Sequence, residues 1–390
     1  MKKGLKFLLV ILTSIGLLLT SGCRDVKEIQ HLNYATAIGV DYKDGKYHSY
    51  IQMVSFEGIA RTEGQTTEGS VWVSEAVADT FEEAFFVVYK TAQERILWAH
   101  VTTILLSETA IKQGFDSIFD SLTRYYEFRL TPWVLGTKDS VKEVLSIPGF
   151  FGQTVLDTIV HEPERIYEQS SQIRPIKLHQ LAREIYEPGE TTFVPSITID
   201  RATWKKDLKE DPKLAPNGAF FIQNEHYKGF HSLNDLGGIR WLSPETIRVD
   251  VPVPEEKNIY FEVVFEYPLS NVEVLLVDGD PKFNINLELT GYFVHRAINK
   301  TMKLEDIETR TKEAITAEIK EMYRLGVEKG VDYYNLEHEL FRKEFTTWQR
   351  LKENGDPFLT ENSIESINID MTIEHTGIMK NESIDIKDIR

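Results

Sequence analysis

The chain opens with a basic and then apolar stretch whose length and flanking residues predict its role. Three lysines stand within the first six residues, and residues 7–19 form an apolar run. This run has 13 residues, whereas a membrane-spanning helix needs roughly 20. A basic start, a short apolar run and small residues before a cut site are typical of a secretory signal peptide. We therefore predict that residues 1–22 are a signal peptide, with cleavage after Gly22.

Short apolar runs then alternate with stretches in which apolar residues recur every three or four positions. Residues 36–56 have the strand–turn–strand pattern of a hairpin, with the turn at 43–46. Thr80 and Glu83 have the spacing of a capping box and predict the start of a helix. The expected apolar face of this helix comprises Phe81, Ala84, Phe85, Val88, Ala92 and Ile96.

Further along the same half, a strand pattern and a helical pattern follow each other twice. Strands are predicted at residues 101–107 and 131–137, and helices at 114–124 and 140–146. The expected buried face of the longer helix comprises Phe115, Ile118, Phe119 and Leu122. Strands that alternate with helices at this spacing imply a mixed sheet covered by helices.

In the second half the pattern changes to alternation of single apolar and polar residues. Two strands are predicted around a turn at Asn224–Glu225. Further strands are predicted at residues 260–267, 271–277, 283–294 and 363–379. Such alternation is typical of an antiparallel sheet with one face in solvent.

Two helices are predicted between these strands. The first spans residues 304–329, and Gly330 is its expected stop because glycine adopts the left-handed conformation at helix ends. The second is predicted at about residues 336–351. Its expected buried positions are Leu336, Leu340, Phe341 and Trp348.

These patterns together predict a multidomain α+β protein with mixed and antiparallel sheets flanked by helices. Residues 204–215 are rich in charge and proline, so they are expected to be a linker. An N-terminal domain would then span residues 23–203 and a C-terminal region 216–390. Whether that region divides again near residue 255 stays open.

Composition sharpens this prediction. Of the 390 residues, 42% are hydrophobic, which is enough for substantial cores, and 61 acidic residues outnumber 44 basic ones. Cleavage of the leader removes three lysines and no acid, so the net charge changes from −17 to −20. Such a charge argues against a nucleic-acid partner and against broad adhesion to anionic lipids.

Cys23 is the only cysteine of the chain, and it directly follows the predicted cut site. A lone cysteine in a secreted chain can pair with another molecule or remain a free thiol. Its position after Ser21-Gly22 instead resembles a bacterial lipobox, although Thr20 replaces the usual apolar residue. Two acyl chains anchor a protein stably, whereas one is marginal. We predict that Cys23 is a lipid attachment site and the first residue of the mature chain.

The sequence contains no strong candidate for a metal site. The densest ligand-type clusters are residues 161–164 and 337–339, and neither has two histidines on one helical face. We expect His338 and its flanking carboxylates to form a solvated helix face. Asp278-Gly279-Asp280 is better explained by a tight turn between strands than by a calcium loop. No metal and no cofactor is therefore predicted.

Enzymatic motifs are also missing from the sequence. There is no phosphate-binding loop, no dinucleotide-binding glycine fingerprint and no G-x-S-x-G nucleophile. Gly237-Gly238 is more simply a turn or bulge. A carboxylate pair for glycoside hydrolysis has no specific support among 61 acids. A binding or assembly role is therefore favoured over catalysis.

Several stretches of the chain resemble the Ger(x)C family, the lipoprotein C-subunits of nutrient germinant receptors in endospore-forming bacteria. The resemblance covers nearly the whole mature chain in the same order. The stretches that carry it are Cys23–Ile29, Ile38-Gly39-Val40-Asp41, LTRYYEFRLTPWVLGT, AFFIQNEHYKGFHSLNDLGGIRWLS, EAITAEIKEMYRLGVEKGVD, FRKEFTTWQRLKEN and Glu374-His375-Thr376-Gly377. One departure is Arg24, which stands where the family usually has a tryptophan.

The resemblance implies a non-enzymatic receptor subunit that takes part in spore germination. It implies two integral-membrane partners, the A- and B-type subunits, and a position on the outer face of the spore inner membrane. Cys23 would hold the chain there through palmitate-type acyl chains. The family has no established catalytic residues, so the resemblance assigns none to this chain.

Two other classes of protein stay open as alternatives. A solute-binding lipoprotein of a transporter would normally carry a flexible polar tether after its cysteine and two parallel α/β lobes around a cleft. Here almost no tether exists and the later strands are expected to be antiparallel. A cell-envelope hydrolase would need activity that depends on a specific carboxylate pair.

Overall fold

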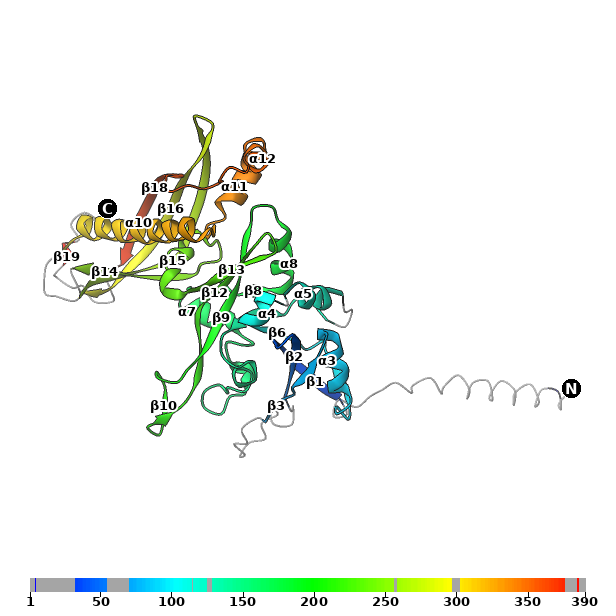
Figure 1. The fold of residues 1–390 in the computed structure, drawn as a ribbon. Helices are drawn as coiled ribbons and strands as arrows, with labels where there is room; N and C mark the ends of the chain where they lie inside the picture. The colour runs from blue at the N-terminus through cyan, green and yellow to red at the C-terminus, as the bar shows by residue number, and fades with distance from the viewer. Residues whose placement is uncertain are drawn as a thin grey trace.

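The protein is described by a computed structural model of residues 4, 32–54, 70–113, 115–124, 128–255, 258–296, 302–375 and 384–385. Two large sheets dominate these residues, one in each half of the chain (Figure 1). The prediction of a multidomain α+β protein with mixed and antiparallel sheets is confirmed. The predicted signal peptide and Cys23 lie outside the described residues.

The first sheet is mixed. In spatial order its main strands are β13 (His226–Ser232), β12 (Lys213–Gln223), β9 (Thr191–Asp200), β7 (Trp133–Thr137), β6 (Thr103–Ser107), β1 (Leu32–Lys43), β2 (Lys46–Val54) and β3 (Val71–Val73). Strands β1, β6, β7 and β9 run parallel at the centre, and the outer strands are antiparallel. The short strands β4 (Ala76–Ala78), β5 (Arg95–Leu97) and β8 (Ile176–Lys177) pair with β2, β1 and β7.

Both faces of this sheet are covered. One face packs against α3 (Phe81–Tyr89), α4 (Glu108–Gln113), α5 (Phe115–Arg124) and α8 (Leu178–Tyr186), and the other against α6 (Val141–Val144). Strand β6 lies between the two apolar clusters, and all of its residues are buried. Since neither face of β6 meets water, its sequence is an apolar run without alternation.

Several local predictions for this half are confirmed. Lys43 pairs with Lys46 across the predicted hairpin turn. Thr80 caps α3, because its Oγ1 accepts a hydrogen bond of 3.1 Å from the backbone nitrogen of Glu83. The predicted helix is too long, however, since α3 ends at Tyr89 and Ile96 lies in β5. Ile96 is nevertheless buried in the same apolar cluster.

The segment predicted to be a linker, residues 204–215, is structured. It contains the short hairpin of β10 (Lys205–Lys206) and β11 (Lys209–Glu210) and the beginning of β12. Strand β12 pairs with β9 on one side and with β13 on the other. The two strands around Asn224–Glu225 therefore extend the first sheet, although they were predicted within the C-terminal region. The division of the chain into domains stays a prediction.

The second sheet has the order β14 (Arg248–Glu255), β15 (Asn258–Val277), β16 (Asp280–Arg296) and β18 (Ile364–His375). The first three strands are antiparallel, as predicted, and β18 runs parallel to β16. The turn of the β15–β16 hairpin lies at Asp278-Gly279, where Gly279 has a φ of 90°. The prediction of a turn there is confirmed.

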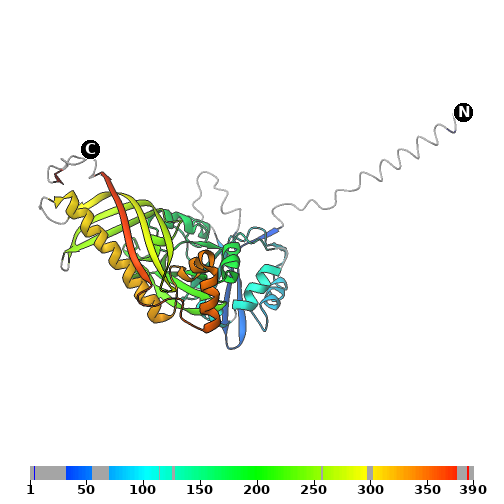
Figure 2. The ribbon, with the colours of Figure 1, turned by 90° about the horizontal axis from the view of Figure 1, so that it is seen from above.

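One long helix, α10 (Leu304–Lys329), covers the inner face of the second sheet. Figure 1 shows it lying across β14, β15 and β16, and Figure 2 shows it beside β18. Ile315 and Ile319 of this helix are fully buried. The helix ends at Gly330, which has a φ of 66° as predicted.

The second predicted helix of this half is two helices. They are α11 (Leu336–Lys343) and α12 (Phe345–Asn354), and they meet at Glu344, whose φ of −135° is not helical. Leu336, Leu340 and Trp348 are buried as predicted. The remaining short elements are α7 (Pro163–Gln169), α9 (Ile239–Leu242), β17 (Met302–Lys303), β19 (Ile384–Asp385) and two 3₁₀ turns, Val155–Asp157 and Leu233–Asp235.

The two sheets share one apolar core. Phe193 of β9 and Phe221 of β12 belong to the same buried cluster as Phe265 of the second sheet and Ile319 of α10. Phe221 contacts Tyr333 with a ring-centroid distance of 5.0 Å. Because a buried apolar cluster joins them, the two halves are expected to unfold together.

Candidate functional site

The predicted lipid attachment site cannot be placed, because Cys23 lies outside the described residues. The other candidate positions from the sequence fall into three places. Asp41 and His161 lie in the first sheet and its cover, and Glu337 lies where the two sheets meet. Each place is a buried group of polar side chains.

Asp41 stands near the end of β1, and its carboxylate collects hydrogen bonds from neighbouring segments. It accepts from Ser107 Oγ at 2.6 Å and from Thr109 Oγ1 at 2.7 Å, and it forms an ion pair with Lys43. Burial alone would raise the pKa of Asp41, but the bonds from Lys43, Ser107 and Thr109 outweigh it and lower the pKa. The ionised carboxylate thereby ties β1 to the start of α4.

Gly39, two residues earlier, has a steric role. A Cβ atom at this position would lie 2.4 Å from Val141 Cγ1 and 3.0 Å from Leu145 Cδ1. Only glycine therefore lets α6 approach β1 this closely. The Gly39 and Asp41 positions of the family resemblance are thus explained by packing and strand anchoring.

His161 lies in a closed polar cluster against β1 and β2. Its Nε2 is 2.9 Å from Gln52 Oε1, and its Nδ1 is 2.5 Å from Thr102 Oγ1. Gln52 Nε2 also donates to the carbonyl oxygen of Leu145 at 2.6 Å. Burial lowers the pKa of His161 to about 3, so the imidazole is neutral at physiological pH. Both ring nitrogens are bonded to side chains of this chain, which indicates a structural role for His161.

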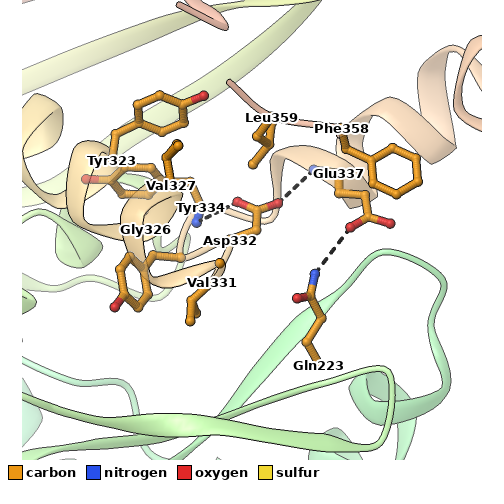
Figure 3. Close-up of a pocket in the computed structure, with 12 residues that line it drawn as sticks. Gln223, Tyr323, Gly326, Val327, Val331, Asp332, Tyr334, Glu337, Phe358 and Leu359 are labelled. Carbon is orange, nitrogen blue, oxygen red and sulfur yellow. Dashed lines mark hydrogen bonds between the residues drawn. The ribbon is translucent and has the colours of Figure 1, made fainter. Parts of the chain in front are cut away.

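The most extensive polar group lies at the junction of the two sheets. We define the junction as the segment 331–337 together with Gln223 of β12 and Trp348 of α12. It begins directly after the C-terminal glycine of α10 and leads into α11. Figure 3 shows the side chains around it and the hydrogen bonds that they form.

Asp332 caps helix α11 from within the junction. Its carboxylate accepts from the backbone nitrogen of Glu337 at 2.7 Å and from that of Tyr334 at 3.2 Å (Figure 3). The side chain is buried, and this burial raises the pKa of Asp332 to about 6 although the backbone donors oppose the rise. The group therefore titrates much closer to neutral pH than an exposed aspartate.

Glu337 links the first sheet to helix α12. Gln223 Nε2 donates to one of its carboxylate oxygens at 3.2 Å, and Trp348 Nε1 donates to the other at 3.3 Å. Burial raises the pKa of Glu337, and the charge of Asp332 adds to this rise. The prediction of a solvated face is thus wrong for Glu337, which is 8% exposed, because the helix turns this residue toward β12.

Two further hydrogen bonds cross the junction. The backbone nitrogen of Thr191 donates to Asn335 Oδ1 at 2.7 Å, and His338 Nδ1 lies 3.0 Å from the carbonyl oxygen of Pro188. These contacts hold the beginning of α11 against the loop before β9. Together with the Gln223–Glu337 bond they join the beginning of α11 to the first sheet.

A cavity lies on each side of the junction segment. One has a volume of about 220 Å³ and includes Gln223, Asp332 and Glu337 in its lining. The other has a volume of about 210 Å³ and is lined by charged side chains that include Arg174 and Glu184. Arg174 Nη2 donates to Glu184 at 2.8 Å, and Thr192 Oγ1 donates to the other Glu184 oxygen at 2.7 Å. The main charges of the second cavity therefore satisfy one another.

Among the residues that the structure describes, no group of three or more metal-binding side chains comes together. Within the same residues, no helix has the length and apolarity required to cross a bilayer. The junction residues Asp332 and Gln223 were not singled out in the sequence as functional candidates. The only signal was their place in stretches that resemble a family, because their partners lie far away in the chain.

Comparisons with known proteins give matches over both halves of the chain. The family described as "Spore germination protein N-terminal domain" matches residues 25–199, and "Spore germination B3/ GerAC like, C-terminal" matches residues 217–377. The protein YfkR of Bacillus subtilis (strain 168) is 22% identical over 389 residues, covering 93% of this chain and 94% of that protein. Spore germination protein KC of the same strain is 20% identical over 401 residues, covering 96% and 97%.

A crystal structure of the GerBC protein has a similar fold. It matches with a TM-score of 0.51 at 16% identity and covers 89% of this chain and 99% of that chain. Both matched segments place the chain among spore germination proteins. The chain belongs to the Ger(x)C family.

Proposed function

We propose that this chain is the lipid-anchored, non-enzymatic subunit of a nutrient germinant receptor, and that it is needed for receptor assembly or signalling. The observation that carries the proposal is the match of both family segments, in order, over most of the chain. The partners are two integral-membrane subunits of the A and B type. The working position is the outer face of the spore inner membrane.

The anchor is the acylated thiol of Cys23. Its support is the order of features at the start of the chain: a basic start, a short apolar run, small residues and then the only cysteine. Peptide mass spectrometry of the chain from its native membrane tests this directly. We expect Cys23 to be the first residue and to carry acyl chains. An unmodified Cys23 behind an uncleaved leader would contradict the anchor.

A role in assembly is supported by how the chain uses its buried polar groups. Asp41, His161 and Glu337 are each bonded to groups of this chain and join segments that are distant in sequence. Asp41 and His161 fix segments within the first half, and Glu337 joins β12 to α12, so these groups serve internal cohesion, which suits a scaffold held beside membrane subunits. Deletion of the gene should abolish germination triggered by the cognate nutrient. Normal germination in a strain that also lacks any paralogue would contradict the role.

A further inference from the structure

Two neighbouring turns on the first half of the chain expose large apolar side chains. Phe151 is 99% exposed and Leu208 is 92% exposed, and Trp204 beside them is 50% exposed. Phe150 connects the two turns, because its ring lies 4.8 Å from the ring of Trp204 in an edge-to-face arrangement. We define the tip as these four residues together with the hairpin 205–210.

Both turns hold an apolar residue in an unfavourable backbone conformation. Phe151 has a φ of 53° and Leu208 a φ of 66°, and each lies next to a second residue with positive φ. This region favours glycine, asparagine and aspartate, and bulky residues rarely occupy it. Leu208 and Phe151 thus combine backbone strain with nearly complete exposure of an apolar side chain. Strain of this kind is characteristic of functional surfaces.

The charges around the tip differ from those of the whole protein. The hairpin 205–210 carries three lysines and two acids, whereas the chain as a whole has a net charge of −17. Lys205, Lys206 and Lys209 are all exposed. Lysines around exposed aromatic and aliphatic side chains are typical of segments that lie at a membrane interface. The hairpin has a net charge of +1, so an anionic surface repels it less than it repels the acidic body of the chain.

The tip lies on the side of the molecule from which a membrane anchor could extend. Figure 1 shows β10 at the same lower end as β1 and β3, opposite α11 and α12. Eight residues lie between Cys23 and Leu32 at the start of β1, so this strand begins within about 30 Å of the anchor. Strand β3 adds Trp72, which is 64% exposed, at this end.

We propose that the tip docks onto the lipid bilayer, with Phe151, Trp204 and Leu208 entering the headgroup region and the lysines contacting anionic headgroups. The proposal rests on the proposed membrane anchoring, because only a tethered chain holds its tip near a bilayer. Docking gives the chain a second point of contact besides its anchor. It therefore fixes the orientation of the junction and of both sheets relative to the membrane.

The test places a fluorescent label at the tip of the full chain, purified from membranes and reconstituted into vesicles. Leu208→Cys is labelled with a thiol-reactive dye, and Leu276→Cys in the β15–β16 hairpin, which is 45% exposed, is the matched control. The vesicles contain phosphatidylcholine with or without phosphatidylglycerol, and nitroxide lipids serve as quenchers. We expect several-fold stronger quenching at position 208 than at position 276, only with phosphatidylglycerol.

Charge variants complete the test. Lys205→Gln and Lys209→Gln should each lower the equilibrium constant for docking about fivefold, since each lysine near an anionic surface contributes about that factor to binding. Equal and weak quenching at positions 208 and 276 would overturn the proposal. A dye signal at position 208 that requires integral-membrane proteins, without quenching by lipid, would also overturn it, because the tip would then be a protein contact.

The labelling also separates this proposal from the lipid anchor. The parent chain has no cysteine except Cys23, so it should take up no dye when that thiol is acylated. Labelling of the parent chain would refute the anchor at Cys23. Quenching at position 208, after subtraction of the parent signal, reports on the tip alone.

Discussion

The two sheets of this protein are buried in different ways. The first has helices or loops on both faces, so that strands such as β6 are buried throughout. The second is covered by α10 on one face only, and its other face presents polar side chains such as Asn286 and Asn368, which are joined by a hydrogen bond of 2.9 Å. Both patterns follow from which faces of a strand meet water.

This difference in coverage determines where the polar side chains of each half lie. The first sheet encloses them, as in the His161–Gln52 cluster, because a sheet covered on both faces has no wet side. The second sheet leaves polar side chains of its open face in solvent, and this half buries the carboxylates of Asp332 and Glu337 at the junction. Substitutions at enclosed groups should therefore cost far more stability than substitutions on the open face.

The largest effect is expected where the two sheets share their core. Phe221 is 1% exposed and packs against Phe193 and Tyr333, so Phe221→Ala should lower the free energy of unfolding by about 3–5 kcal/mol. Both sheets should still melt in one transition. The control is Phe151→Ala at the fully exposed tip, which should leave the free energy unchanged. Calorimetry with two separate transitions in the parent chain would show that the sheets are independent.

A smaller loss of stability is expected when the buried hydrogen bonds of Glu337 at the junction are removed. Glu337→Ala leaves Gln223 Nε2 and Trp348 Nε1 without their acceptor, and about 1–3 kcal/mol is lost for each buried donor left unpaired. Glu339→Ala is the matched control, because Glu339 pairs with Lys343 on the helix surface and such pairs contribute less than about 1 kcal/mol. Chemical denaturation measures both. Equal losses for the two variants would mean that the buried hydrogen bonds of Glu337 contribute no more to stability than a surface ion pair.

Acid should destabilise the first sheet through His161. Its pKa is about 3 in the folded chain and 6.5 when exposed, so below pH 6.5 the unfolded chain binds the extra proton. Stability then falls by about 1.4 kcal/mol per pH unit, or about 2 kcal/mol between pH 6.5 and pH 5. Urea unfolding of the parent chain and of His161→Gln, at both pH values, measures how much the free energy of unfolding changes with pH in each. Equal changes would show that His161 is not buried in its neutral form.

The junction should respond to acid with the opposite sign. Asp332 has a pKa of about 6 when folded and 3.8 when exposed, so between these values the folded chain binds the extra proton. Its contribution to stability therefore increases as the pH falls from 6 toward 4. The same titration of Asp332→Asn should lack this contribution. An identical pH dependence of the free energy of unfolding in the parent chain and in Asp332→Asn would contradict the burial of Asp332.

The smallest effect is expected on the open face of the second sheet. Asn368→Ala removes two exposed hydrogen bonds, to Asn286 and Ser366, and should change the free energy of unfolding by less than about 0.5 kcal/mol. Denaturation of the isolated chain measures this. A loss of 2 kcal/mol or more, on the scale of about one buried group, would mean that this face is covered in solution.

Local patterns predicted the elements better than their connections. The cap at Thr80, the turn at Gly279 and the end of α10 at Gly330 follow from short-range chemistry and were all predicted. The break at Glu344 went unpredicted, because the apolar spacing continues across it. The pairing of β12 with β9 depends on residues distant in the chain, so local patterns do not predict it. The same reason hid the junction, where Gln223 and Glu337 are 114 residues apart.

The proposed role of this chain is that of an anchored subunit beside two integral-membrane proteins. Purification of the tagged chain from dormant-spore membranes in mild detergent, followed by quantitative mass spectrometry, tests this role most directly. We expect two multispanning proteins, of the A and B type, in amounts equal to that of the chain. Recovery of the chain alone, under conditions that keep other membrane complexes intact, would contradict the account.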